Sequence, residues 1–102
     1  MTKIIQAKRF KKNFSSLFEN IVEKSPQFAL NLLDSFDQII ASIDRFPEIG
    51  VPRIRNWYGN NVTLRDVEVF VGQRQFTVRY YYKKSLSQIV LLHIWIDGQK
   101  HD

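Results

Sequence analysis

The sequence predicts a small α+β domain, in which a helical hairpin packs on a mainly antiparallel twisted sheet in the order β-α-α-β-β-β. Residues 10–43 repeat their apolar side chains at steps of three and four, as amphipathic helices do. Residues 62–96 are instead rich in Val, Ile, Phe and Tyr, in short runs separated by turn residues, as strands are. The length, 102 residues, suits one domain, so residues 1–102 are assigned to a single domain.

The first predicted element is a short edge strand around Ile4 and Ile5, in a basic segment. Residues 1–12 carry five basic residues and no acid. Cations at the beginning of a helix oppose its dipole. The basic cluster at residues 8–12 is therefore either a solvated face or a contact for an acidic partner.

Two helices follow, joined by a short break. Their apolar stripes extend over residues 10–22 and 28–43. The Ser-Pro pair at residues 25–26 suits the N-cap and the first position of the second helix. Pro47 and Gly50 end that helix. A short connection between two amphipathic helices predicts an antiparallel hairpin.

The second half of the chain is predicted as a three-strand meander over residues 62–71, 75–83 and 88–96. The last run is apolar almost throughout, so we expect it to be the central strand, covered on both faces. In the first run the apolar alternation changes phase across Arg65 and Asp66, which predicts a bulge or bend there.

The segment between the helices and the meander, residues 51–61, is predicted as a loop. It carries Arg53, Arg55, Trp57 and Tyr58. An exposed Trp-Tyr pair beside arginines is a candidate contact site, because these residue types dominate binding hot spots. The alternative is that Trp57 folds back to cap the core.

The composition excludes several classes of function. There is no cysteine, so disulfides, thiolate metal sites and a cysteine nucleophile are excluded. The only histidines are His93 and His101, and the four glycines form no phosphate loop, so we expect no metal and no cofactor. The sequence has neither a signal-peptide pattern nor the ~20 apolar residues of a membrane span, so we expect a cytoplasmic protein.

The net charge of +5 and the aromatic content of 14% indicate an anionic partner, either nucleic acid or an acidic protein. Arg79, Tyr81 and Lys83 share one face of a predicted strand, and Arg65 lies on the neighbouring strand. Such a face can hold RNA or an acidic protein strand, and a solvated face with cation–π pairs is an equal alternative. For His93, in an apolar strand, a structural role is favoured over a catalytic one.

Several local sequences, in order and spacing, resemble the RelE/ParE toxin superfamily of bacterial type II toxin–antitoxin systems, and its ParE-like branch best. Residues 44–53 resemble the Phe-Pro-x-x-Gly ending of the second helix and the arginine-bearing segment after it. The pair at 64–65, the strand at 76–80 and the apolar strand at 89–95 follow in the family's order. Ile96 stands where many ParE-like sequences have a histidine.

The resemblance implies this fold and a non-enzymatic toxin of the plasmid-stabilisation type, which binds DNA gyrase and arrests growth. It also implies a cognate acidic antitoxin, with a homodimer or a toxin–antitoxin heterotetramer as compatible assemblies. The residues expected to contact the target or the antitoxin are Arg53, Trp57, Arg65, Arg79 and Tyr81.

Two alternatives stay open. The first is a RelE-like endoribonuclease that cleaves mRNA on the ribosome. In that case Arg65 and Arg79 stabilise the charged transition state, and His93 or His101 moves the proton. The second is an inactive family member that only binds its partner. Proteins of one fold differ in activity, so the resemblance alone does not separate these functions.

Overall fold

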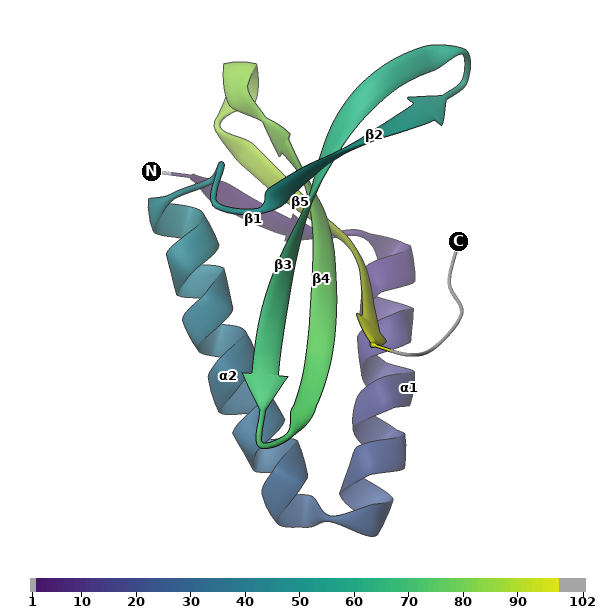
Figure 1. The fold of residues 1–102 in the computed structure, drawn as a ribbon, viewed down its shortest axis with the longest axis vertical. Helices are drawn as coiled ribbons and strands as arrows, with labels where there is room; N and C mark the ends of the chain where they lie inside the picture. Colours follow the sequence, from purple (N-terminus) through teal and green to yellow (C-terminus); the bar gives the residue numbers. More distant parts are fainter. Residues whose placement is uncertain (1, 98–102) are drawn as a thin grey trace.

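A computed structural model describes residues 2–97 and confirms the α+β class, with a helical hairpin on a mainly antiparallel sheet (Figure 1). The elements in chain order are β1 (Lys3–Gln6), α1 (Lys8–Lys24), α2 (Pro26–Arg45), β2 (Val51–Trp57), β3 (Asn60–Val71), β4 (Arg74–Lys83), the short 3-10 helix η1 (Lys84–Leu86) and β5 (Gln88–Ile96). Residues 2–97 therefore contain one strand more than the sequence predicts.

The five strands form one sheet in the order β1-β5-β4-β3-β2. β1 pairs with β5 in parallel, and the other three pairings are antiparallel. The prediction that the last strand is central is wrong, because β4 occupies the middle position. β5 is still an internal strand between β1 and β4, and this position accounts for its apolar sequence.

The extra strand is β2, which lies in the segment predicted as a loop. All of its residues are exposed, so its sequence shows no alternation of buried and exposed positions. Tyr58 and Gly59 connect it to β3 with φ angles of 52° and 82°. Positive φ at both central residues is the geometry of the type I′ turn, which matches the twist of paired strands. β2 and the first part of β3 extend beyond the helices as a two-stranded arm (Figure 1).

Of the bulge or bend predicted at Arg65 and Asp66, the bulge is wrong. β3 pairs continuously with β2 and with β4 through both residues. The register shift of the sheet lies instead between β4 and β5, at Arg79 and Tyr80. The apolar phase of β3 changes because the buried face changes: Leu64 is buried on one face, while residues 67–71 bury alternate side chains against α2 on the other.

The helical hairpin covers one face of the sheet, with α1 against β5 and α2 against β3. Ser25 is the predicted N-cap of α2, and its Oγ accepts a hydrogen bond from the backbone N–H of Phe28 at 3.2 Å. The two helices meet through Phe10, Phe14 and Phe36. The helix-facing side of β4 is completely buried in this core at Phe76, Val78 and Tyr80. The apolar stripes thus pack as predicted, and the helices leave the other face of the sheet open.

Candidate functional site on the open face of the sheet

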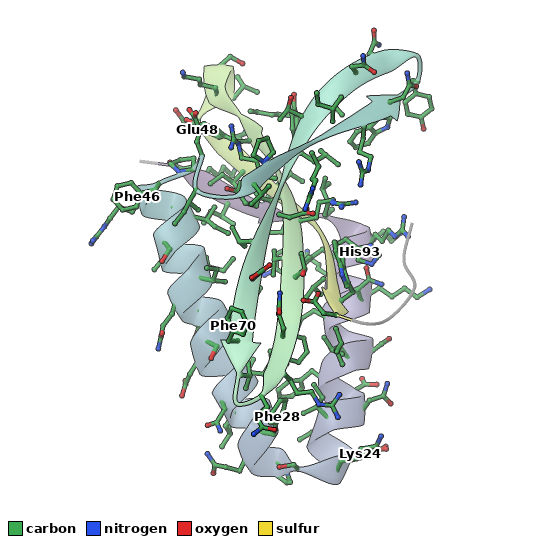
Figure 2. All side chains as sticks on the ribbon, viewed as in Figure 1. Lys24, Phe28, Phe46, Glu48, Phe70 and His93 are labelled. Atoms are coloured by element: carbon green, nitrogen blue, oxygen red, sulfur yellow. The ribbon has the colours of Figure 1, made fainter. Side chains whose placement is uncertain are left out.

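A groove of about 670 Å³ lies on the face of the sheet that the helices leave open. Cross-strand pairing puts Asp66 beside Arg79, Glu68 beside Thr77, and Thr77 beside Trp95 on this face. Phe70, on the same face of β3, is exposed (Figure 2). The groove lining includes Arg53, Arg55, Asp66, Thr77, Arg79 and Trp95. Charged and aromatic side chains therefore make up much of the surface available to a partner.

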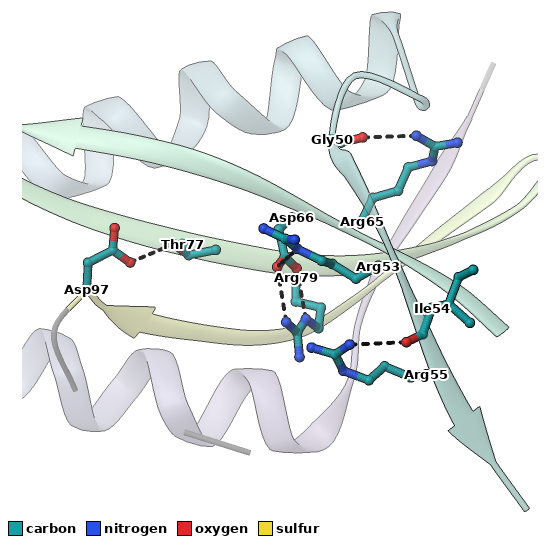
Figure 3. Close-up of polar contacts among 9 residues, drawn as sticks. All are labelled: Gly50, Arg53, Ile54, Arg55, Arg65, Asp66, Thr77, Arg79 and Asp97. Carbon is teal, nitrogen blue, oxygen red and sulfur yellow. Dashed lines mark hydrogen bonds and ion pairs between the residues drawn. The ribbon is translucent and has the colours of Figure 1, made fainter. Parts of the chain in front are cut away.

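Asp66 is the centre of the groove's charge network (Figure 3). Arg79 donates to it through both sides of the guanidinium, with Nε 2.8 Å from Oδ1 and Nη2 3.0 Å from Oδ2. Arg53 is the second cation, with Nε 3.5 Å from Oδ2. The side chains of Asp66 and Arg79 are 11% and 12% exposed, whereas that of Arg53 is 52% exposed. One buried carboxylate thus serves two arginines, of which only Arg53 extends into solvent.

Arg79 is held on its other side by an aromatic ring. Its Cζ lies 5.1 Å from the centre of the Trp95 ring, a cation–π contact. His93 packs edge-on against the same ring at 5.3 Å between centroids. The bidentate pair with Asp66 and this stacking fix Arg79 in place, so its charge is largely compensated within the protein.

Arg65 lies on the opposite face of the sheet from Arg79. Its Cα partner on β4 is Tyr80, which faces the helices. Arg65 Nη1 donates to the backbone oxygens of Glu48 at 3.1 Å and Gly50 at 2.9 Å. Its Nη2 is 3.8 Å from the Glu48 carboxylate. The structure therefore does not bring Arg65 together with the other predicted contact residues.

Tyr80 completes this second arrangement, and the predicted site did not include it. Its hydroxyl donates to the backbone oxygen of Pro47 at 2.7 Å and accepts from the N–H of Gly50 at 3.0 Å. Burial raises the pKa of Tyr80, and the Gly50 N–H opposes that rise. In the sequence Tyr80 is one of the alternate apolar residues of β4. That pattern predicts that it is buried but gives no signal of the hydrogen bonds that its hydroxyl makes.

The two side chains give a physical reason for the Phe-Pro-x-x-Gly motif. Arg65 and Tyr80 hold the turn from α2 into β2 by its backbone. A Cβ atom on Gly50 would lie 2.8 Å from Arg65 Cβ and 3.0 Å from the Tyr80 ring. Only glycine fits so close to both. The motif thus sets the position from which β2 leaves the body of the domain.

The remaining predicted residues lie along the arm and the open face. Trp57 and Tyr58 are at the tip of the arm, with exposed fractions of 43% and 93%, so Trp57 does not fold back over the core. Tyr81 is partly buried on the same face of β4 as Arg79. Arg55 is exposed and lines the groove, but it is not among the residues predicted to contact the target or the antitoxin. If residues 51–57 are taken as a strand, the alternation of side chains puts Arg55 on the same face as Arg53. His101 lies outside the described residues.

Residues 2–97 contain neither a candidate metal site nor a candidate membrane-spanning helix. No group of three or more His, Asp or Glu side chains in this part of the chain is arranged to hold a metal ion. No helix in this part of the chain is both long enough and apolar enough to cross a membrane.

Comparison with known proteins finds a similar solved structure. The sequence matches no family model, and no curated protein is significantly similar to it. The structure superposes on that of a metal-bound toxin from Helicobacter pylori with a TM-score of 0.60. The match covers 96% of this chain and 97% of the toxin, at 16% sequence identity. The chain therefore has, over almost its whole length, the fold of this toxin.

Proposed function

We propose that the protein is the toxin of a type II toxin–antitoxin pair, which arrests bacterial growth and is neutralised by a cognate antitoxin. The observation that carries this proposal is the shared fold with the Helicobacter pylori toxin over nearly the full length of both chains. The resemblance of residues 44–53 and of the later strands to the RelE/ParE superfamily supports the same reading from the sequence.

The target we propose is DNA gyrase, as for the ParE-like branch. The protein would inhibit gyrase by binding to it and would catalyse no reaction. Cations that stabilise a cleaved phosphate must converge on that phosphate. Arg65 and Arg79 lie on opposite faces of the sheet. Each is engaged by a carboxylate, Glu48 for Arg65 and Asp66 for Arg79. This arrangement favours a binding protein over a ribonuclease.

The binding surface we propose is the groove together with the arm. Arg53, Arg55 and Trp57 are exposed there, and they belong to the residue types enriched in protein interfaces. Arg53 and Arg55 are the cations that the groove presents to solvent. A positive surface on a chain of net charge +5 also steers an acidic antitoxin toward it.

The test combines growth with two purified assays. Induced expression in a bacterial host should arrest growth, and the purified protein should inhibit gyrase supercoiling and leave ribosome-programmed mRNA intact. Reversing both groove charges, Arg53→Glu with Arg55→Glu, should weaken inhibition at least about tenfold, equivalent to ~1.4 kcal/mol of binding.

The matched control reverses two exposed charges away from the groove, Lys24→Glu with Arg45→Glu, and should keep full inhibition. Ribosome-dependent cleavage by the natural chain, lost in an Arg65→Ala variant that still folds, would instead establish the endoribonuclease. Normal growth at high expression of the folded protein would leave a family member that only binds its partner.

A further inference from the structure

The outer edge of β2 has no partner strand among residues 2–97. β2 is the last strand of the sheet and pairs only with β3. All seven of its residues are exposed, including Ile54 at 68%. The arm carries this edge beyond the helical hairpin (Figure 1). An exposed strand edge is a template on which another extended chain can pair.

The register of the hairpin shows which backbone groups the edge offers. Trp57 and Asn60 flank a two-residue turn, so they form a hydrogen-bonded pair, and such pairs alternate along the arm. Pro52, Ile54 and Asn56 therefore turn their backbone groups away from β3. Pro52 is compatible with this position because it has no N–H to leave unpaired.

One contact agrees with this assignment. Arg55 Nη1 donates to the backbone oxygen of Ile54 at 3.1 Å, so the guanidinium covers a carbonyl on the outer side of the strand (Figure 3). A carboxylate on an incoming strand can draw this guanidinium away and expose the carbonyl for pairing.

The side chains of β2 select the chemistry of the partner strand. Arg53 and Arg55 point to the groove face, and Ile54 points to the other face. No acidic residue occurs between positions 49 and 65. A strand laid along β2 gains most with carboxylates beside Arg53 and Arg55 and an apolar side chain beside Ile54, because opposite charges and apolar pairs stabilise neighbouring strands.

A second copy of this chain is a poor occupant. If two β2 strands pair antiparallel about Ile54, Arg53 of each copy lies opposite Arg55 of the other. Like charges directly opposite each other destabilise a strand pair. The arginines thus disfavour self-pairing at this edge in that register and favour an acidic partner.

We propose that the outer edge of β2 receives an extended segment of the antitoxin, acidic on one face and apolar on the other, as a sixth strand of the sheet. This deepens the proposed function and rests on it, because it specifies how the partner of the toxin binds. Strand addition of this kind takes affinity from the backbone and selectivity from alternate side chains.

The probe is a short synthetic peptide of alternating Glu and Val, added to the isotope-labelled full chain. Amide hydrogen exchange read by NMR should slow at least about tenfold at Ile54 and Asn56, whose N–H groups face outward. The slowing should be smaller at Arg53 and Arg55, whose N–H groups already face β3. No slowing at Ile54 and Asn56, or equal slowing along the whole arm, overturns the proposal.

Two matched comparisons separate backbone pairing from charge attraction. Ile54→Pro removes the outward N–H and should weaken peptide binding at least about tenfold relative to Ile54→Thr, which keeps it. A peptide of alternating Lys and Val should bind the natural chain at least about tenfold more weakly than the Glu-Val peptide. Equal binding by Ile54→Pro and Ile54→Thr refutes pairing along the edge, and equal binding of the Glu-Val and Lys-Val peptides refutes the selection of an acidic strand.

These outcomes are independent of the growth assay. A chain that pairs with the peptide at β2 but does not arrest growth keeps this edge site and loses the proposed function. A chain that arrests growth without pairing loses only the edge site.

Discussion

Tyr80 shows how much one hydroxyl group can do in this fold. It lies in the core, yet it both donates to and accepts from the backbone of the turn between α2 and β2. We expect Tyr80→Phe to lower the free energy of unfolding by about 1–3 kcal/mol, because two backbone groups lose their partner. Urea denaturation measures this. Tyr82→Phe, on the same face of β4, is the control and should cost less than about 0.5 kcal/mol.

The same hydroxyl predicts a pH dependence. Burial raises the folded pKa of Tyr80 above its ordinary value of 10.0, so the folded state holds the proton more tightly than the unfolded chain. Its contribution to stability is complete below pH 10.0 and is lost as the pH rises through the folded pKa. Tyr80→Phe should therefore lose less stability at alkaline pH than the natural chain. Urea denaturation at a series of pH values above 10.0 measures this. If the natural chain and Tyr80→Phe lose the same free energy of unfolding over that range, the Tyr80 hydroxyl is not the group responsible.

The pair of Asp66 and Arg79 gives a second prediction at this scale. Asp66→Ala leaves the largely buried guanidinium of Arg79 without its carboxylate, and we expect a loss of about 3 kcal/mol. The double variant Asp66→Ala with Arg79→Met should lose less than the sum of the single variants, which a double-mutant cycle by urea denaturation measures. Glu48→Ala is the control, because its pair with Arg65 is long and exposed and is worth under ~1 kcal/mol.

The different roles of Arg65 and Arg79 could not be predicted from the sequence. Arg65 and Arg79 look equivalent as exposed basic residues of neighbouring strands. Pairing Arg65 with Tyr80, and Asp66 with Arg79, sends the two arginines to opposite faces. That register depends on where β3 begins, and its first residue, Asn60, lies in the segment predicted as a loop.

Among the elements, the helices were predictable because their stripes are wide and their ends carry signals. Ser25 caps α2, and Gly50 follows it where a side chain cannot fit. β2 was not predictable from its own sequence, because a fully exposed strand buries neither set of alternate residues. Its turn also lacks the usual signal, since Tyr58 stands where type I′ turns favour Asn.

That turn supports a prediction of increased stability. Tyr58 has a φ of 52°, which is unfavourable for a tyrosine, and its side chain is almost fully exposed. Tyr58→Asn should raise the free energy of unfolding by about 1 kcal/mol, since Asn tolerates this region. Thermal and urea denaturation check this. Gly59→Ala, at a φ of 82°, should lower the free energy of unfolding by about 1 kcal/mol. If Gly59→Ala raises it instead, positive φ in this turn does not explain the effect of Tyr58→Asn.

The whole molecule divides into a body and an arm. Phe10, Phe76 and Tyr80 are completely buried in the body, between the helices and the sheet. The arm consists of β2 and the first part of β3. Where it extends past α1 and α2, no helix covers either of its faces (Figure 1). Isolated two-stranded ribbons are marginally stable in water. The arm is therefore expected to open locally while the body stays folded.

Amide hydrogen exchange measures this division. The N–H of Arg55, directed toward β3, should exchange about a hundredfold faster than that of Val78 in the middle of the sheet, although both belong to strand ladders. Equal protection would show that arm and body open together as one cooperative unit.

The parallel pairing of β1 with β5 has a consequence for synthesis. β1 is made before the other described elements, and its only partner strand among residues 2–97 is β5, the last of them. The helical hairpin is complete long before β5 exists to cover the apolar side of α1. The sheet can therefore close only after about residue 96 has emerged, and the nascent chain exposes its apolar surface until then. The order of strands thus couples the first strand of the sheet to the last one, so the sheet cannot be completed by local folding as the chain grows.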